Sequence, residues 1–242
     1  MSDVGDRDAV VRALIEQESW SEGDKPAVVG DMQRLCRAAT RALPALGVGV
    51  TLISSAGPQV TVAASGEQVE LIEELQFSLG EGPCFEAYGT RRPVLIPDLL
   101  AVASTRWLGY AAAAQQHGVR AVFAFPLQIG AARLGVMDIY KSEPGNLSIE
   151  ALGQALTFAE VATGSMLDGQ LAPDSRDGVL HHAVDNRYEV FQAQGMVMVQ
   201  LGVGLAEAMV RIRGYAYAHD RRLNDVAADI VNGRVALEPD AP

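Results

Sequence analysis

The chain has 242 residues, of which 49% are hydrophobic and 6% aromatic, so it is long enough for one or two globular domains and too apolar to be disordered. Its formal net charge of -11 at pH 7 argues against nucleic-acid binding driven by the field of the whole protein. The acidity is uneven, because residues 181–236 hold six acidic side chains and six arginines and are locally neutral.

Cysteine use and hydropathy bear on the compartment. The two cysteines, Cys36 and Cys84, are far apart in sequence, which fits a reducing cytoplasm better than a disulfide scaffold. The first residues are polar and charged, and no apolar run is long enough to span a membrane. We therefore expect a cytoplasmic protein that makes no membrane contact.

The first two thirds of the chain show helices and strands in mixed order. Amphipathic helices are predicted at residues 7–18 and 28–43, because apolar side chains recur there at helical spacing. Two strands joined by a turn-rich loop are predicted at 48–53 and 59–64. The later elements are a helix at 66–75, a turn at 79–84, a short helix at 85–88, a strand at 93–96, a helix at 107–117, strands at 121–127 and 134–140, and a helix at 148–167. This order predicts an α+β domain with one antiparallel sheet.

Five short motifs in this region resemble the GAF domain, an intracellular sensor module for small ligands. They are Gly49-Val50-Thr51-Leu52, Leu79-Gly80-Glu81-Gly82-Pro83-Cys84, Pro93-Val94-Leu95-Ile96-Pro97-Asp98-Leu99, Ala124-Phe125-Pro126-Leu127 and Leu134-Gly135-Val136-Met137-Asp138. The resemblance implies an antiparallel sheet with flanking helices, and a ligand pocket over one face of the sheet. We expect that pocket to be lined by Phe77, Cys84, Phe85, Trp107 and Tyr110. The sequence names neither the ligand nor a cofactor.

Cys84 is the residue that most suggests chemistry. It opens a predicted helix, where the helix dipole lowers the pKa of a thiol, but a small buried side chain is the favoured interpretation. Some proteins of GAF fold are free methionine sulfoxide reductases, which need a further cysteine, and there is none between Asp98 and Arg120. Cys36 is expected to be structural, and we expect no catalytic residue and no enzyme.

The remaining polar candidates are interpreted as structural. His117 precedes Gly118 and is expected to end a helix, where the C-terminal dipole favours it. Asp98 and Asp138 are each expected to follow a strand, and structural capping is the expected role. The sequence has no phosphate-binding glycine loop and no cysteine or histidine spacing typical of a metal site.

The C-terminal part has the pattern of three short helices after a linker at 169–179. The first, at 180–201, is expected to bury Val184, Tyr188, Phe191, Gly195 and Met198. The second begins near Leu205 with Gly204 as its N-cap, and buries Leu205, Met209, Ile212 and Ala216. The third contains Leu223, Val226, Ala227, Ile230 and Val231 at helical spacing. So small a bundle needs a partner chain or the preceding domain for stability.

This part resembles the ANTAR domain, an RNA-binding output module of bacterial antitermination regulators. The resemblance rests on Gln192-Ala193-Gln194-Gly195-Met196-Val197-Met198, Ala206-Glu207-Ala208, Arg211-Ile212-Arg213-Gly214-Tyr215-Ala216 and Leu223-Asn224-Asp225-Val226-Ala227. The order GAF then ANTAR is similar to a regulator architecture common in actinobacteria. The expected organisation is an N-terminal segment at 1–27, the sensor domain at 28–168, the linker, an all-α three-helix ANTAR bundle at 180–237 and a tail at 238–242.

RNA binding would use the outer face of the bundle. Arginine suits phosphates and unpaired bases, and a tyrosine can stack on a base. One of Tyr215 and Tyr217 is expected to be core, because residues two apart do not share a helix face. The residues that we expect at the RNA are Arg187, Gln194, Gly195, Arg213, Tyr217, Arg221 and Arg222. Gln194 stands where the family usually has lysine, which removes one phosphate contact.

The resemblance implies a homodimer whose two bundles bind tandem RNA stem-loops and keep a terminator from forming, under control of a small molecule or partner at the GAF domain. Two alternatives stay open. The turn at 202–204 followed by residues 209–217 is similar to a helix-turn-helix that binds DNA. Alternatively, the arginines form a solvated face and the chain binds only proteins.

Overall fold

The computed structural model describes residues 2–19, 28–53, 59–103, 105–171, 188–219 and 221–238. Its centre is a five-stranded antiparallel sheet in the order β2-β1-β5-β4-β3. The strands are β1 (Gly47–Ile53), β2 (Gln59–Ala64), β3 (Val94–Ile96), β4 (Ala121–Ile129) and β5 (Ala132–Lys141). The predicted α+β domain with one antiparallel sheet is therefore confirmed. The predicted loop between β1 and β2 lies outside the described residues.

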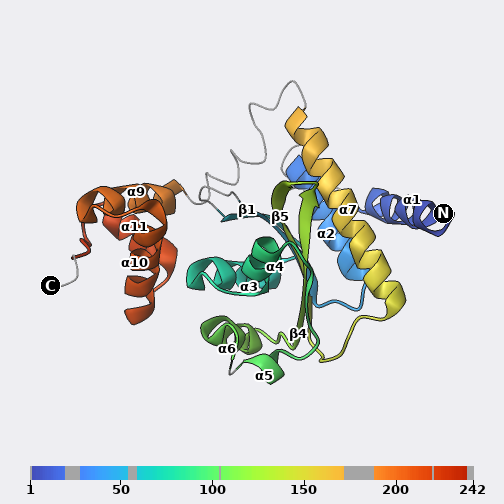
Figure 1. The fold of residues 1–242 in the computed structure, drawn as a ribbon, viewed down its shortest axis with the longest axis horizontal. Coiled ribbons are helices and arrows are strands. Elements are labelled where there is room, and N and C mark those ends of the chain that lie inside the picture. Colours follow the sequence, from blue (N-terminus) through green and yellow to red (C-terminus); the bar gives the residue numbers. More distant parts are fainter. Residues whose placement is uncertain are drawn as a thin grey trace.

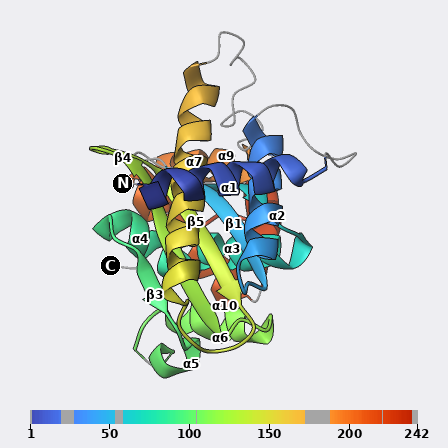
Figure 2. The same ribbon diagram turned by 90° about the vertical axis from the view of Figure 1, so that its right-hand side faces the viewer.

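Helices cover both faces of this sheet (Figures 1 and 2). One face carries α1 (Ser2–Gln17), α2 (Val28–Ala42) and α7 (Ile149–Leu171). The other carries α3 (Glu67–Leu79), α4 (Pro83–Thr90), α5 (Leu99–Val102) and α6 (Leu108–Gln116). Strand side chains alternate between the two layers, so Phe123 and Phe125 pack toward α2 and α7, whereas Val122 and Ala124 pack toward α3 to α6.

The helices and strands expected from periodicity are all present up to residue 171, with ends that differ by a few residues. The pattern did not indicate α5, a single turn of helix. Asp98 is its N-cap, and its Oδ1 accepts a hydrogen bond of 3.1 Å from the backbone N–H of Leu100. The capping role predicted for Asp98 is thus confirmed, as is His117 at the C-terminal end of α6.

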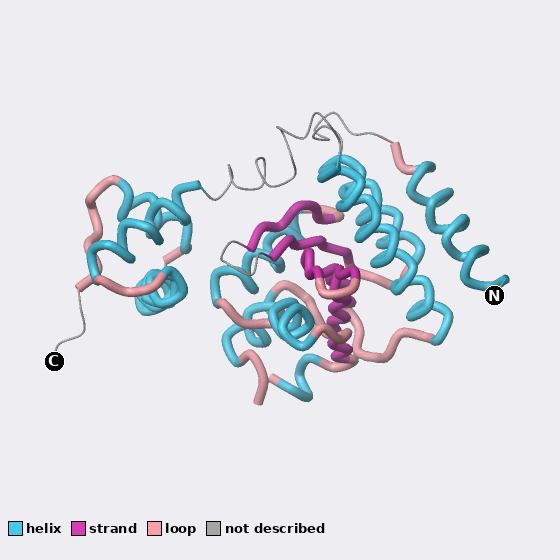
Figure 3. Tube along the Cα trace, turned by 45° about the horizontal axis from the view of Figure 1, so that its top comes forward, coloured by secondary structure: helices cyan, strands magenta, loops and turns pink. Residues whose placement is uncertain are grey.

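The C-terminal part is a bundle of α9 (Tyr188–Leu201), α10 (Leu205–Ala218) and α11 (Leu223–Val231) (Figure 3). Residues 172–187, which precede α9, lie outside the described residues. The axes of α9 and α10 differ in direction by 105°. Gly204 is the N-cap of α10, as predicted, and its carbonyl accepts a hydrogen bond of 2.9 Å from the N–H of Ala208. The predicted all-α bundle after the sensor domain is therefore confirmed.

The buried face of α9 agrees with the expected one at Met198, which packs against the core of the bundle, but otherwise differs from it. The side chains that enter the core are Val190, Ala193 and Val197, whereas Tyr188 is 62% exposed. Val184 lies outside the described residues. The error has a physical cause, because small residues let α10 and α11 approach α9 closely, and periodicity alone does not say which of two adjacent stripes is used. On α10, Met209, Ile212 and Ala216 are buried as expected, but Leu205 is not.

None of the described helices is by itself long and apolar enough to cross a membrane, although the bent pair α9 and α10 together meets that length and composition.

Candidate sensor core and nucleic-acid interface

Two carboxyl groups lie completely inside the sensor domain. Glu73 on α3 and Asp138 on β5 are both 0% exposed. Glu73 Oε1 accepts a hydrogen bond of 2.8 Å from the hydroxyl of Tyr140, and its Oε2 accepts one of 2.8 Å from Thr51 Oγ1. Asp138 lies in the middle of a strand, so the prediction that it caps the backbone is wrong.

Gln76 ties this cluster together from α3. Its Nε2 donates to Asp138 Oδ2 and to the hydroxyl of Tyr140, both at 3.1 Å. Its Oε1 accepts a hydrogen bond of 2.9 Å from the backbone N–H of Cys84 at the start of α4. The amide therefore joins the sheet, α3 and α4 through one fully buried side chain, and a buried amide with these partners is favourable where an unpaired one would be costly.

Glycines in two of the GAF-like motifs make room for the cluster. A Cβ at Gly49 would lie 2.3 Å from Glu73 Oε1, and one at Gly82 would lie 2.4 Å from Gln76 Oε1. Gly82 also has φ 143°, a conformation that side chains rarely adopt. Both motif glycines are thus explained by the polar side chains of α3 that pack against them.

Burial governs the ionisation of this cluster. It raises the pKa of Asp138 well above its ordinary value of 3.8, and the nearby charge of Glu73 acts in the same direction. Burial likewise raises the pKa of Cys84, with the charges of Asp138 and Glu73 adding to the effect. Desolvation therefore outweighs the helix dipole at Cys84, and the thiol is held protonated and unreactive. Burial also raises the pKa of Cys36.

The residues expected to line the ligand pocket do not all share one environment. Cys84 and Tyr110 are 0% exposed and pack in the core between the sheet and α3 to α6, and Trp107 packs against the same core. Phe85 is half-buried on α4. Phe77 does not line this region, because its ring belongs to the apolar core of the C-terminal bundle. The expectation that all five residues surround one pocket is therefore wrong for Phe77.

A groove of 470 Å³ lies on the opposite face of the sheet, between α7 and the end of β4. Its lining includes Phe125, Ala159 and Gly164, together with the half-exposed side chains of Leu156 and Ile129. Most of the lining is apolar, although Arg91, Gln128, Glu160 and Thr163 also belong to it. Its small residues on α7 permit another helix to approach closely.

The motifs do not single out Glu73 and Gln76, yet the helix spacing contains a signal. Val69, Ile72, Glu73 and Gln76 share one inward stripe of α3. Polar side chains in such a stripe indicate a buried hydrogen-bonded cluster.

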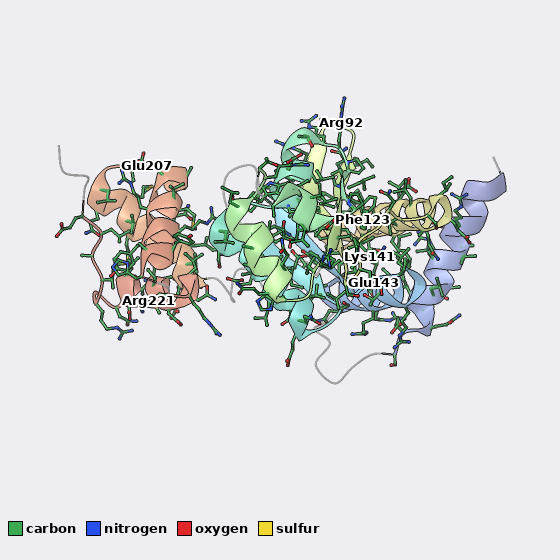
Figure 4. All side chains as sticks on the ribbon, turned by 90° about the horizontal axis from the view of Figure 1, so that it is seen from below. Arg92, Phe123, Lys141, Glu143, Glu207 and Arg221 are labelled. Atoms are coloured by element: carbon green, nitrogen blue, oxygen red, sulfur yellow. The ribbon has the colours of Figure 1, made fainter. Side chains whose placement is uncertain are left out.

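The arginines expected at RNA lie in different surroundings. Arg222 is exposed and is the N-cap of α11, whereas Arg221 is bound to Asp229 by an Nη2–Oδ2 contact of 2.6 Å. Hydrogen bonds from Arg221 and Arg234 lower the pKa of Asp229. Arg221 lies at the outside of the bundle, far from Glu207 in Figure 4. Arg187 lies outside the described residues, and Arg213 packs against the sensor domain.

The two tyrosines of α10 divide as expected. Tyr215 is partly buried and stacks on His219 with ring centroids 3.9 Å apart, while Tyr217 is 77% exposed. Gly195 has open space where a side chain would stand. Gln194 is turned inward, and its Nε2 donates a hydrogen bond of 2.7 Å to the carbonyl of Leu205. The expectation that Gln194 points outward is wrong, because the amide satisfies a carbonyl at the first turn of α10.

No described group of histidine, cysteine, aspartate and glutamate side chains has the geometry to hold a metal ion.

Comparison with known proteins gives two family matches. Residues 31–164 match the family model of the GAF domain, and residues 179–231 match that of the ANTAR domain. No curated protein matches the chain.

Solved structures similar to this chain have low sequence identity to it. The GAF domain from a phosphoenolpyruvate-protein phosphotransferase of Coxiella burnetii is 14% identical, with a TM-score of 0.53 over 69% of this chain and 94% of that one. A GAF domain from the Acinetobacter phosphoenolpyruvate-protein phosphotransferase is also 14% identical, with a TM-score of 0.49 over 76% and 97%. Type II free methionine-R-sulfoxide reductase from Thermoplasma acidophilum is 17% identical, with a TM-score of 0.46 over 57% and 91%. The first of these shows that the two chains share the fold.

Proposed function

The chain belongs to the GAF domain family and carries an ANTAR domain at its C-terminal end, and on this premise we propose that it is a cytoplasmic regulator that binds nascent RNA through tandem stem-loops. The GAF domain is a sensor module, and the ANTAR domain is the RNA-binding output module of antitermination regulators. In our proposal two copies of the chain present their bundles to paired stem-loops, and a terminator is kept from forming. The input is a small molecule or a partner that acts on the GAF domain.

The observation that carries this proposal is the corner between α10 and α11. Tyr217 leaves 77% of its surface exposed there, near the C-terminal end of α10. Arg222 is exposed a few residues later, at the N-terminal end of α11, where the helix dipole favours a phosphate. An exposed ring at the end of α10 and an exposed guanidinium at the start of α11 suit an unpaired base and its phosphate.

The same corner provides the test. Binding of the full chain to an RNA with two stem-loops is compared with binding to duplex DNA of the same sequence over a salt series. We expect RNA to bind more tightly, and Tyr217→Ala to weaken it by a factor on the order of ten to one hundred, because stacking of one base is worth about 1–3 kcal/mol. Arg222→Ala should reduce the slope of log affinity against log salt by about one.

Arg12→Ala is the matched control, since Arg12 is an exposed arginine on α1 of the sensor domain. It should leave affinity and salt slope unchanged. Equal or tighter binding to duplex DNA would favour a helix-turn-helix regulator. A chain that binds neither nucleic acid would instead be a protein-interaction module.

For the homodimer we propose the groove between α7 and β4 as the contact surface. Leu156 and Ile129 are 42% and 56% exposed beside it, and exposed apolar side chains that line a groove are typical of an interface. Light scattering should give twice the chain mass of 25.7 kDa for the wild type and the single mass for Leu156→Arg. A monomeric wild type at micromolar concentration would contradict this part of the proposal.

A further inference from the structure

The sensor domain and the ANTAR bundle meet at Phe77 and Arg213. Phe77 lies on α3 of the sensor domain, but only 2% of it is exposed because its ring packs into the core of the bundle. The guanidinium carbon of Arg213, on α10, lies 5.3 Å from the centre of that ring. This distance is within the range of a cation–π contact, which holds an arginine over an aromatic face.

Gly80 completes a site for the same guanidinium. A Cβ at this position would lie 2.6 Å from Arg213 Nη1 and 3.1 Å from Cζ, so only glycine leaves room for the side chain as it stands. Gly80 also has φ 69° as the C-cap of α3, a conformation that glycine adopts without strain. The end of α3 thus offers Arg213 the aromatic face of Phe77 and the space left by the missing side chain of Gly80.

The charge of α3 favours the same contact. The C-terminal end of a helix carries partial negative charge and attracts cations. The first turn of α3 contains Glu67 and Glu70, but its last turn has no basic residue of its own. Arg213 therefore brings from the other domain the cation that this helix end lacks.

The position of this surface is fixed from inside the sensor domain. Glu73 and Gln76 hold α3 against the sheet through the buried hydrogen bonds to Thr51, Tyr140 and Asp138. Phe77 follows Gln76 directly, so its ring is presented to α10 by a helix that cannot shift without disturbing the cluster. A surface held in place loses little conformational entropy when its occupant docks.

We propose that the C-terminal end of α3, formed by Phe77 and Gly80, is a docking surface for helix α10 of the same chain, and that docking competes with RNA for Arg213. The competition rests on the proposed function, together with the RNA contact that the ANTAR resemblance predicts for Arg213. Its guanidinium lies over Phe77 and its Nε atom is buried, so a phosphate or base cannot take the same place. RNA binding through Arg213 then requires the two domains to separate.

The two equilibria are linked. If only the undocked bundle binds RNA, the apparent RNA affinity equals the intrinsic affinity multiplied by the fraction of undocked chains. RNA in turn shifts the docking equilibrium toward the undocked state by the same factor. Because both domains are on one chain, the effective concentration of one for the other is on the order of millimolar, and a small contact is enough to keep them together.

The test removes the aromatic face and measures docking and RNA binding separately. In the full chain, Phe77→Ala should raise the affinity for a two-stem-loop RNA about tenfold, the factor expected from losing one partly desolvated cation–π contact together with the packing of the ring. Without RNA, hydrogen exchange of the backbone amides at the end of α3 and in the middle of α10 should accelerate. Saturating RNA should produce the same acceleration at the end of α3 in the wild type.

Leu71→Ala is the matched control, because Leu71 is a half-exposed apolar residue of α3 that lies outside the bundle core. It should change neither readout. Phe77→Leu keeps apolar volume without the ring, and it serves as the variant if Phe77→Ala does not fold. It should raise the affinity by a smaller factor.

Two results would overturn the proposal, and they are distinguishable. If Phe77→Ala accelerates exchange but RNA affinity stays within twofold of the wild type, docking does not mask the RNA contact and the proposed function stands. If exchange accelerates and neither protein binds RNA, the proposed function and the competition that depends on it both fail.

Discussion

In the sensor domain, Glu73, Gln76 and Asp138 lie completely out of solvent, whereas in the bundle the groups suited to a ligand, Tyr217 and Arg222, lie on the outside. The difference follows from size. A five-stranded sheet with helices on both faces can enclose a hydrogen-bonded polar cluster within an apolar core, while the interior of three short helices is formed mainly by apolar side chains such as Val197, Ile212 and Ala227. The polar candidates of the sensor domain therefore lie in its interior, and those of the bundle lie at its surface.

The largest effect that would sharpen this comparison is expected in the core of the bundle. Ile212→Ala should lower the free energy of unfolding of the bundle by about 3 kcal/mol, because a fully buried side chain is truncated in a small core. RNA binding should be lost with the fold. Thermal unfolding followed by circular dichroism measures the change. Val210 lies on the same helix and is 62% exposed, so Val210→Ala should leave the unfolding temperature unchanged.

A somewhat smaller effect is expected at the buried amide of the sensor domain. Gln76→Ala leaves the carboxyl of Asp138, the hydroxyl of Tyr140 and the N–H of Cys84 without this partner, which should cost about 2–3 kcal/mol in denaturant unfolding. Gln68→Ala, at an exposed position of the same helix, is the control and should cost little. If both variants lose the same free energy of unfolding, the buried cluster does not contribute more to stability than an exposed side chain does.

The buried carboxyl also predicts how stability depends on pH. Because the pKa of Asp138 is raised in the folded state above its ordinary value of 3.8, the folded chain binds this proton more tightly than the unfolded chain. The stabilisation from this group is present below that value and is lost as pH rises toward the folded pKa. Asp138→Asn should flatten this part of the pH profile and change stability on the order of 1 kcal/mol at neutral pH. An unchanged profile in chemical denaturation would contradict the assignment.

The smallest effect is expected from the charged residues on the surface of the bundle. Asp229→Asn weakens the contacts to Arg221 and Arg234, but exposed ion pairs contribute little, and the unfolding temperature should stay within about 2 °C. A large fall in unfolding temperature would mean that the surface of the bundle is as important to its fold as its interior.

Periodicity and motif order were sufficient for the elements up to residue 171 except α5, and for the presence of two family domains. Apolar spacing located the other helices and strands in this part of the chain, with ends that differ by a few residues. These features are local, because the repeat of apolar residues that marks a helix or a strand lies within that element's own residues. The buried state of Cys84 was also foreseen, since a small apolar thiol after a tight turn is most often core.

Tertiary structure decided which polar side chains meet. Glu73 and Asp138 are separated in sequence by α4 to α6 and two strands, and only the folding of β5 against α3 brings them together. The inward turn of Gln194 depends on the angle between α9 and α10, and the place of Phe77 depends on a domain more than one hundred residues later. Such contacts are set by packing between elements, and a side chain's partner across an interface is not determined by its own neighbours in sequence.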